Sequence, residues 1–227
     1  MKKVIVALDF AHTDEAIDMV KQIGEGLEWV KIGMEAFYSD PLILERVQKL
    51  NLKVFLDLKL HDIPNTVSKS MNVLSKKSVD MTNVHCLGGS EMMTAAKKAF
   101  NHPEQSLLGV TQLTSSSEEQ IQTEQGVKES LENSVLRLAR LAKNSGLNGI
   151  VCSALEVQKI KLELGSDFKC ICPGIRFPED KKSDQKRVVD PATAKQLGCD
   201  FIVMGRSITK ASDPRQAFLK AKQEFEG

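Results

Sequence analysis

Short apolar segments recur along this chain, and they constrain its fold more than any other feature. Eight such runs are rich in hydrophobic and β-branched residues: Val4–Asp9, Trp29–Gly33, Lys53–Lys59, Met81–His85, Leu107–Leu113, Gly149–Ala154, Phe168–Ile175 and Phe201–Ile208. Hydrophobic residues are nearly continuous within each run, rather than alternating with polar ones. This pattern predicts parallel β-strands that are covered on both faces.

The segments between these runs carry apolar residues at helical spacing. The i, i+4, i+7 pattern occurs at four places: Ala16/Val20/Ile23, Ile43/Val47/Leu50, Val67/Met71/Leu74 and Leu131/Val135/Leu138. Residues that commonly precede helices are Ser90, which follows two glycines, and Asp190 and Asp213, each followed by proline. We therefore expect helices between the strands, with N-caps at Ser90, Asp190 and Asp213.

Eight strands that alternate with helices predict an α/β fold, a (β/α)8 TIM barrel. The 227 residues fit a single barrel domain over residues 1–227, because such domains often contain about 250 residues. An open, doubly wound sheet is the alternative. Its nucleotide-binding versions carry a G-x-G-x-x-G turn after the first strand, and this chain lacks that sequence.

Charge and apolar content exclude several classes of protein. The 31 Lys and Arg residues balance 30 Asp and Glu residues, so no basic excess indicates nucleic-acid binding. No apolar run approaches the roughly 18 residues that span a bilayer, and MKKVIVALDF lacks a signal-peptide cleavage site. Five cysteines without C-x-x-C spacing are typical of free thiols in a reducing compartment. We expect a cytoplasmic protein without nucleic-acid or membrane partners.

Charged residues lie at or near the C-terminal ends of the first three predicted strands. Asp9 ends the first, Lys31 lies in the second, and Asp57 and Lys59 lie in the third. In a barrel these ends converge on one mouth, so the residues become neighbours. Asp57 and Lys59 are two positions apart and point to one face, while Asp62 follows in the next loop. The sequence predicts an array in which lysines and aspartates alternate.

Such an array has two interpretations. Ordinary ion pairs are one of them, and a single pair would be read that way. Charges at the same height on three strands favour a catalytic site instead, because buried charges are costly unless they are paired. Neighbouring carboxylates favour the charged ammonium form of Lys59. A charged amine that is held in place can act as a general acid.

Residues after the last two predicted strands indicate a phosphate site. Gly205 and Arg206 follow the eighth strand and Arg176 follows the seventh, where barrels of this kind commonly bind phosphate. Glycine lets a backbone N–H approach a phosphate oxygen, and arginine offers a planar pair of donors. We therefore expect a phosphorylated small-molecule substrate. No metal site or cofactor is predicted, since the histidines lack ligand spacing: they are His12, His61, His85 and His102.

Two polar stretches, Thr114–Glu129 and Pro178–Lys186, are long for loops that follow barrel strands. Loops at these positions form the active-site face of a barrel. Both stretches are candidates for lids or substrate contacts. Their composition is equally compatible with ordinary solvated loops.

Several motifs together resemble the orotidine 5′-phosphate decarboxylase family in its bacterial form. In order they are VALD, VKIG, FLDLKLHDIPNTV, VTQLTS, PGIR with DQ nine residues further on, and VMGRSIT. The D-x-K-x-x-D pattern also occurs in sugar-phosphate relatives, whereas the full set, which runs nearly end to end, is specific. The resemblance implies a cofactor-independent carboxy-lyase. Its reaction would convert orotidine 5′-phosphate to UMP and CO2 in pyrimidine biosynthesis.

The resemblance also implies roles for the strand-end charges. Lys59 would give a proton to C6 of the pyrimidine, and Asp57 would lie against the carboxylate that leaves. Lys31 would bridge Asp57 and the ribose, and Asp9 would bind a ribose hydroxyl. Asp62 and Thr66 would reach into the neighbouring subunit's site, which implies a homodimer with shared active sites. The other implied substrate contacts are Thr114 at the pyrimidine edge and Gln185, Gly205, Arg206 and Arg176 at the phosphate.

Two alternatives stay open. Magnesium-dependent relatives, such as 3-keto-L-gulonate 6-phosphate decarboxylase or hexulose-phosphate synthase, resemble this chain at D-x-K-x-x-D. They carry an acid where this chain has Lys31, whose charge would repel a metal ion. A non-catalytic nucleotide sensor on the same barrel would usually have lost Lys59 or Asp57, and both are present. The sequence therefore favours the decarboxylase.

Overall fold

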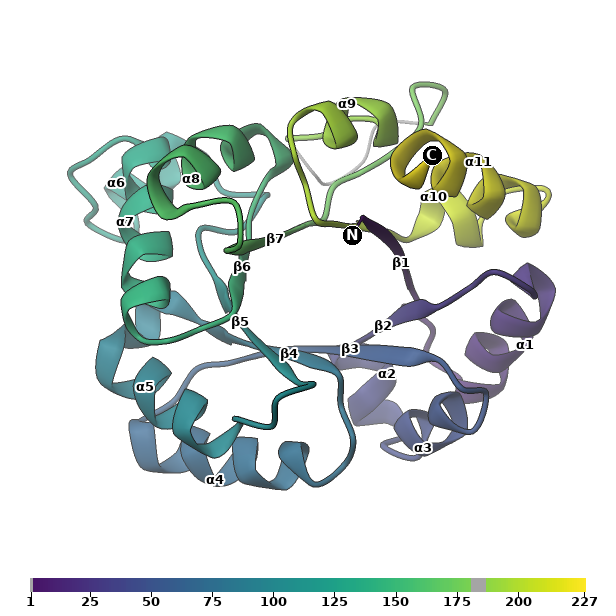
Figure 1. The fold of residues 1–227 in the computed structure, drawn as a ribbon, viewed down its shortest axis with the longest axis horizontal. Coiled ribbons are helices and arrows are strands. Elements are labelled where there is room, and N and C mark those ends of the chain that lie inside the picture. Colours follow the sequence, from purple (N-terminus) through teal and green to yellow (C-terminus); the bar gives the residue numbers. More distant parts are fainter. Residues whose placement is uncertain (1, 181–186) are drawn as a thin grey trace.

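Eight parallel strands close into a barrel that is surrounded by helices (Figure 1). The computed structural model describes residues 2–180 and 187–227. Within them the strands are β1 (Lys3–Ala7), β2 (Trp29–Gly33), β3 (Lys53–Leu60), β4 (Met81–His85), β5 (Ser106–Val110), β6 (Gly149–Val151), β7 (Lys169–Cys172) and β8 (Phe201–Met204). Each strand pairs with its neighbours in sequence, and β8 pairs with β1. The predicted (β/α)8 barrel is confirmed, and the open sheet is wrong.

Helices follow the strands and cover the outside of the barrel. They are α1 (Thr13–Ile23), α2 (Met34–Ser39), α3 (Ile43–Gln48), α4 (Pro64–Ser75), α5 (Gly89–Ala99), α6 (Glu118–Thr123), α7 (Leu131–Asn144), α8 (Val157–Leu164), α9 (Pro191–Gln196), α10 (Arg206–Thr209) and α11 (Pro214–Glu226). Short 3-10 turns, η1 (Cys86–Gly88) and η2 (Ala154–Glu156), follow β4 and β6. No helix of the described ranges is both long and apolar enough to cross a membrane.

The predicted helix starts are confirmed at two of three positions. The Asp190 and Asp213 side chains accept hydrogen bonds from the third backbone N–H of α9 and α11, as N-caps do. The prediction for Ser90 is wrong, since α5 begins at Gly89 and its N-cap is Gly88. The chain already turns through η1 at this point, so the helix starts before the serine is reached.

Most residues of the predicted helical spacing are buried against the barrel. The two exceptions are Leu131, which is half-buried, and Leu50, which is 39% exposed. Leu50 is exposed because α3 ends at Gln48, before the next helical turn is completed. Buried members of the pattern are Ala16, Val20, Ile23, Ile43, Val47, Val67, Met71, Leu74, Val135 and Leu138. The helices therefore attach to the barrel through one apolar side.

The expected free thiols are also found, since all five cysteines are buried and unbridged.

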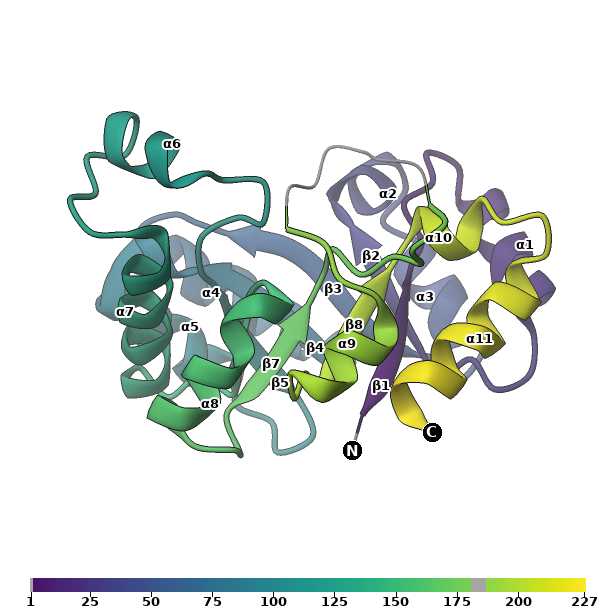
Figure 2. The same cartoon turned by 90° about the horizontal axis from the view of Figure 1, so that it is seen from above.

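Side chains that point into the barrel are apolar toward the N-terminal ends of the strands and charged at the C-terminal ends. A separate interior cluster includes Ile5, Trp29, Phe55 and Phe201, and the larger cluster lies between strands and helices. Because side chains alternate along a strand, the residue two positions beyond an interior one also points inward. These inward rows are Ile5–Ala7–Asp9, Trp29–Lys31 and Phe55–Asp57. In Figure 2 strands β1 and β8 run from the side of the N-terminus toward the edge that carries α6 and α10.

The two polar stretches differ in structure. Thr114–Glu129 contains α6, which begins with a capping box between Ser117 and Gln120. This helix was not predicted, although the S-x-x-Q spacing is a known signal for a helix start. Most of the other stretch, Pro178–Lys186, lies outside the described residues.

Candidate active site

A cavity of about 300 Å³ opens at the C-terminal ends of the strands. Its wall combines apolar groups of the barrel interior, such as Phe55 and Val203, with charged groups from the mouth. Eight of the residues predicted for the site line it: Asp9, Lys31, Asp57, Lys59, Thr114, Arg176, Gly205 and Arg206. The fold therefore brings together residues from the first and last parts of the chain.

Four alternating charges form the floor of this cavity. Lys31 Nζ lies 2.7 Å from Asp9 Oδ1 and 3.7 Å from Asp57 Oδ2, and Lys59 Nζ lies 2.7 Å from Asp57 Oδ1. The side chains of Lys31 and Asp57 are only 11% and 13% exposed, and that of Lys59 is 29% exposed. Four residues of the predicted array, Asp9, Lys31, Asp57 and Lys59, thus form a continuous chain of contacts, which we call the tetrad.

Asp57 is the centre of the tetrad and remains ionised. Burial alone would raise the pKa of its carboxyl group, but Lys31, Lys59 and two hydrogen bonds outweigh that effect, so the pKa lies below its ordinary value. One of these bonds comes from Asn83, whose Nδ2 donates to Asp57 Oδ1 over 2.7 Å. A fixed negative charge therefore lies beside the amine of Lys59.

An irregularity in β3 aims Lys59 at Asp57. The five residues of β3 from Leu56 to Leu60 lie opposite only three residues of β4, from Thr82 to Val84. Lys59 has a φ of 51°, which a residue with a side chain seldom adopts. Its N–H donates to Asn83 Oδ1 over 2.7 Å, so a side chain replaces the missing strand-to-strand bond. Such strain is typical of residues that a site holds in place.

Asn83 was missed by the sequence analysis. It is fully buried in β4, and both ends of its amide contact the tetrad region. The available signal was an amide side chain inside a predicted buried strand, since buried amides require partners.

Gly33 provides room for the outer part of the tetrad. A Cβ atom at this position would lie 2.8 Å from Asp9 Oδ1 and 3.0 Å from Lys31 Nζ. The absence of a side chain at the end of β2 therefore lets this ion pair lie directly on the backbone.

The part of the cavity lining that follows β7 and β8 carries two arginines. Gly205 precedes α10 and Arg206 is its first residue. Arg176 follows β7 in a segment that runs beside Val189, since its N–H donates to the Val189 carbonyl over 3.0 Å. Both arginines line the same cavity as Gly205, and the phosphate site stays a prediction.

Two predicted site residues, Asp62 and Thr66, are not among the residues that line the cavity of this chain. Asp62 and Thr66 are exposed, and Asp62 Oδ1 accepts the N–H of Ile63 over 2.7 Å. Gln185 lies outside the described residues.

His61 and His85 make contacts with each other and with the backbone. His61 and His85 stack with ring centroids 5.5 Å apart, and His85 Nδ1 accepts the N–H of Leu87. Burial, followed by the nearby His61 and Lys59, lowers the pKa of His85 to about 4. His85 is therefore neutral at pH 7. Within residues 2–180 and 187–227, no group of three or more His, Cys, Asp or Glu side chains is arranged to hold a metal ion.

Comparison with known proteins finds one family that is similar to this chain over nearly its whole length. Residues 2–221 match the family described as orotidine 5′-phosphate decarboxylase / HUMPS. An orotidine 5′-phosphate decarboxylase of Listeria innocua is 50% identical over 232 residues, covering 99% of both chains. One of Streptococcus suis is 48% identical over 223 residues, covering 97% of this chain and 96% of the relative.

A solved structure of a protein with the same name as these relatives is also similar to this chain. The crystal structure of orotidine 5′-phosphate decarboxylase from Lactobacillus acidophilus superposes with a TM-score of 0.88 at 39% identity, covering 100% of both chains. A family match over nearly the whole sequence and relatives of this identity leave one assignment. The chain belongs to the orotidine 5′-phosphate decarboxylase / HUMPS family.

Proposed function

We propose that this chain decarboxylates orotidine 5′-phosphate to UMP and CO2, without a metal ion or an organic cofactor. The observation that carries the proposal is the tetrad on the cavity floor, with Arg176 and Arg206 in the wall of the same cavity. An ammonium group and carboxylates in contact suit a reaction in which charge develops on carbon. The names of the relatives support the same substrate.

The proposed substrate has one group for each part of the cavity. Its phosphate is assigned to Gly205 and Arg206, with help from Arg176 and from Gln185. Guanidinium and backbone N–H donors suit a dianion. The ribose is assigned to Asp9 and Lys31, and the pyrimidine edge to Thr114. A volume of about 300 Å³ is at the lower end for small-molecule sites, which span roughly 300 to 1,000 Å³.

Lys59 is the proposed proton donor. The bond between C6 and the carboxylate carbon breaks, CO2 leaves, and the electron pair stays on C6. The Lys59 ammonium group then gives its proton to C6, which forms UMP, and the amine takes a new proton from water. Because no carbonyl group is adjacent to absorb the electrons, a fixed positive charge aimed at C6 is the stabilisation that the protein can offer.

Asp57 has two proposed effects. It holds the Lys59 amine at 2.7 Å, which orients the proton donor before the substrate binds. It also lies where the substrate carboxylate is expected, so the two negative charges would repel until CO2 has left. Phosphate binding at a distance from C6 supplies the free energy that holds the substrate in this position.

A homodimer with shared sites is part of the proposal. Asp62 and Thr66 are exposed and are not among the residues that line the cavity of their own chain, which supports their assignment to the site of a neighbouring subunit. An exposed apolar residue beside Asp62 supports a covered surface, since Ile63, just before α4, is 65% exposed.

The magnesium-dependent relatives are the second candidate, and Lys31 argues against them. Its amine lies between two carboxylates, 2.7 Å from Asp9 and 3.7 Å from Asp57. A divalent cation at this place would meet a positive charge instead of a third acidic ligand.

Turnover by metal-free protein tests the reaction. Purified protein treated with EDTA should convert orotidine 5′-phosphate to UMP, followed by loss of the orotate absorbance. The absence of turnover, or turnover only after magnesium is added, would contradict the proposal.

Two variants test the roles of residues. Lys59→Ala should bind nucleotide but lose nearly all turnover, because the proton donor acts in the transition state while the phosphate contacts remain. Wild-type turnover would show that the role of Lys59 is wrong. Mixing this variant with inactive Asp62→Ala protein should restore part of the activity through hybrid dimers. No recovery after proven subunit exchange would count against shared sites.

A further inference from the structure

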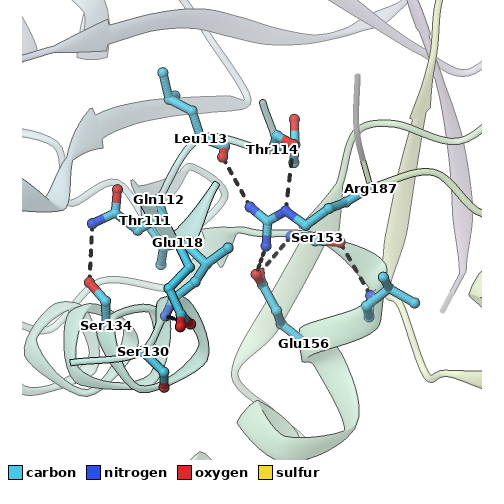
Figure 3. A network of polar contacts seen from close by, with 12 residues as sticks. Thr111, Gln112, Leu113, Thr114, Glu118, Ser130, Ser134, Ser153, Glu156 and Arg187 are labelled. Carbon is cyan, nitrogen blue, oxygen red and sulfur yellow. Dashed lines mark hydrogen bonds and ion pairs between the residues drawn. The ribbon is translucent and has the colours of Figure 1, made fainter. Parts of the chain in front are cut away.

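One arginine outside the cavity lining joins three loops at the mouth of the barrel (Figure 3). Arg187 lies between β7 and α9, and its guanidinium forms an ion pair with Glu156 of η2. It also donates from Nη2 to the Leu113 carbonyl over 3.0 Å and from Nε to the Thr114 carbonyl over 3.5 Å. A single side chain thus connects the segments that follow β5, β6 and β7.

The ion pair of Arg187 is not a solvated surface contact. The Arg187 and Glu156 side chains are 15% and 8% exposed. The second carboxylate oxygen of Glu156 accepts the N–H of Ser153 over 2.8 Å, so the acid is itself held at the start of η2. A buried ion pair adds little net stability compared with apolar residues of similar size. What it provides here is a fixed relative position of three loops.

Both ends of this connection reach the cavity wall. Thr114 and Arg176 line the cavity, whereas Arg187 does not. The segment that carries Arg187 runs beside the one that carries Arg176, because Ile175 and Val189 form a parallel bridge. On the other side, Arg187 holds the backbone carbonyls on either side of the Thr114 N–H. It therefore fixes the Thr114 segment from behind, without occupying space that a substrate needs.

We propose that Arg187, held by Glu156, is a positioning residue for the reaction. It sets the separation between the wall with Thr114, which faces the base, and the wall with Arg176, which faces the phosphate. This inference rests on the proposed substrate. A nucleotide must contact both walls at once, so a change in their separation weakens one contact whenever the other is made.

Three substitutions separate positioning from folding. Arg187→Lys keeps the positive charge beside Glu156 but lacks the planar donors that reach the carbonyls. Glu156→Gln keeps an acceptor for Ser153 but removes the negative charge. Arg140→Ala is the matched control, since it removes an exposed arginine–glutamate pair between α7 and α8.

Steady-state kinetics and urea unfolding are measured for each variant. We expect kcat/KM to fall by about 10-fold or more in Arg187→Lys and Glu156→Gln, because small displacements of positioning groups have effects of up to about 100-fold. Arg140→Ala should keep the wild-type value. The unfolding midpoint of Arg187→Lys should stay near that of the control.

A double-mutant cycle supplies the readout that a purely structural role would not change. Thr114→Ala is measured in the wild-type and in the Arg187→Lys background. If Arg187 positions Thr114, the loss of kcat/KM caused by Thr114→Ala should be at least about 3-fold smaller in the Arg187→Lys background than in the wild type. The reason is that Arg187→Lys has already impaired the contact between Thr114 and the substrate. Equal losses in both backgrounds would overturn the proposal. So would wild-type kcat/KM in Arg187→Lys, or a loss that merely follows the unfolded fraction.

Failure of the proposed function gives a different result. In that case the wild-type protein would not turn over orotidine 5′-phosphate, whatever the variants do. UMP affinity, measured by calorimetry, still tests the positioning role then. A weaker UMP affinity in Arg187→Lys, with Arg140→Ala unchanged, supports the role, and equal affinity overturns it.

Discussion

Replacement of Asn83 by alanine tests the support of the tetrad most directly. Asn83 is fully buried and makes two hydrogen bonds of 2.7 Å, one to the Asp57 carboxylate and one from the Lys59 N–H. A hydrogen bond to a charged group contributes about 1.5 to 3 kcal/mol, and a buried N–H left without a partner costs about 1 to 3 kcal/mol. These two contributions add up to the expected loss of stability. Because Lys31 and Lys59 still hold Asp57 in the variant, we expect a loss in the lower half of that summed range. Asn83→Ala should lower the free energy of unfolding by about 3 kcal/mol.

Urea unfolding at pH 7, followed by circular dichroism, measures this loss. The midpoint should fall while the slope stays constant, which identifies a change in stability rather than in compactness. Asn101→Ala is the control, since Asn101 is exposed and such substitutions change stability by about 0.5 kcal/mol or less. Turnover should also fall, because the backbone of Lys59 is released. A loss of less than about 1 kcal/mol for Asn83→Ala would refute the reasoning, since neither bond would then be contributing as expected.

Three further predictions concern the same cluster. Lys59→Gly should be more stable than Lys59→Ala by about 1 kcal/mol in urea unfolding, because the φ of 51° disfavours a residue with a Cβ atom; equal stabilities would mean that this backbone conformation carries no strain. Gly33→Ala should leave the unfolding midpoint nearly unchanged but weaken UMP binding in calorimetry, since its Cβ would displace only the ends of Asp9 and Lys31; unaltered affinity would contradict the assigned close approach. Because the pKa of Asp57 is lowered in the folded protein, its ionised form stabilises the fold above pH 3.8, its ordinary value, and this contribution is lost as pH falls through the lower folded pKa. As pH is lowered below 3.8, Asp57→Asn should therefore lose less stability in urea unfolding than the wild type does. Equal losses in the two proteins would show that Asp57 does not cause this pH dependence of stability.

The positions of the tetrad could be predicted because they depend on strand periodicity alone. Residues two apart point to the same side of a strand, and the ends of parallel strands in a barrel meet at one mouth. These two rules place Asp9, Lys31 and Asp57 together without knowledge of any contact. The same reasoning gave Lys59 the correct neighbour, although its backbone reaches that place by a route that strict alternation does not describe.

Other parts of the site depend on contacts that no local pattern specifies. Asn83 and Arg187 act through partners 24 to 74 positions away, and nothing in their own segments names those partners. Ser90 fails as an N-cap for a related reason, since the preceding η1 turn decides where α5 begins. Local sequence is thus informative where one strand or helix decides the outcome, and insufficient where several loops meet.

The closure of the barrel has a consequence for synthesis of the chain on the ribosome. Lys3 to Val6 of β1 pair with Phe201 to Met204 of β8, so this edge of β1 gains its partner only after β8 has emerged from the ribosome. Until then β1 and β7 present open edges, which can pair with other chains and lead to aggregation. The strands of the tetrad, β1 to β3, are made early, whereas Arg176, Gly205 and Arg206 follow near the end. A chain interrupted before β8 would therefore hold the tetrad on an unclosed sheet, and conditions that slow elongation should favour insoluble protein.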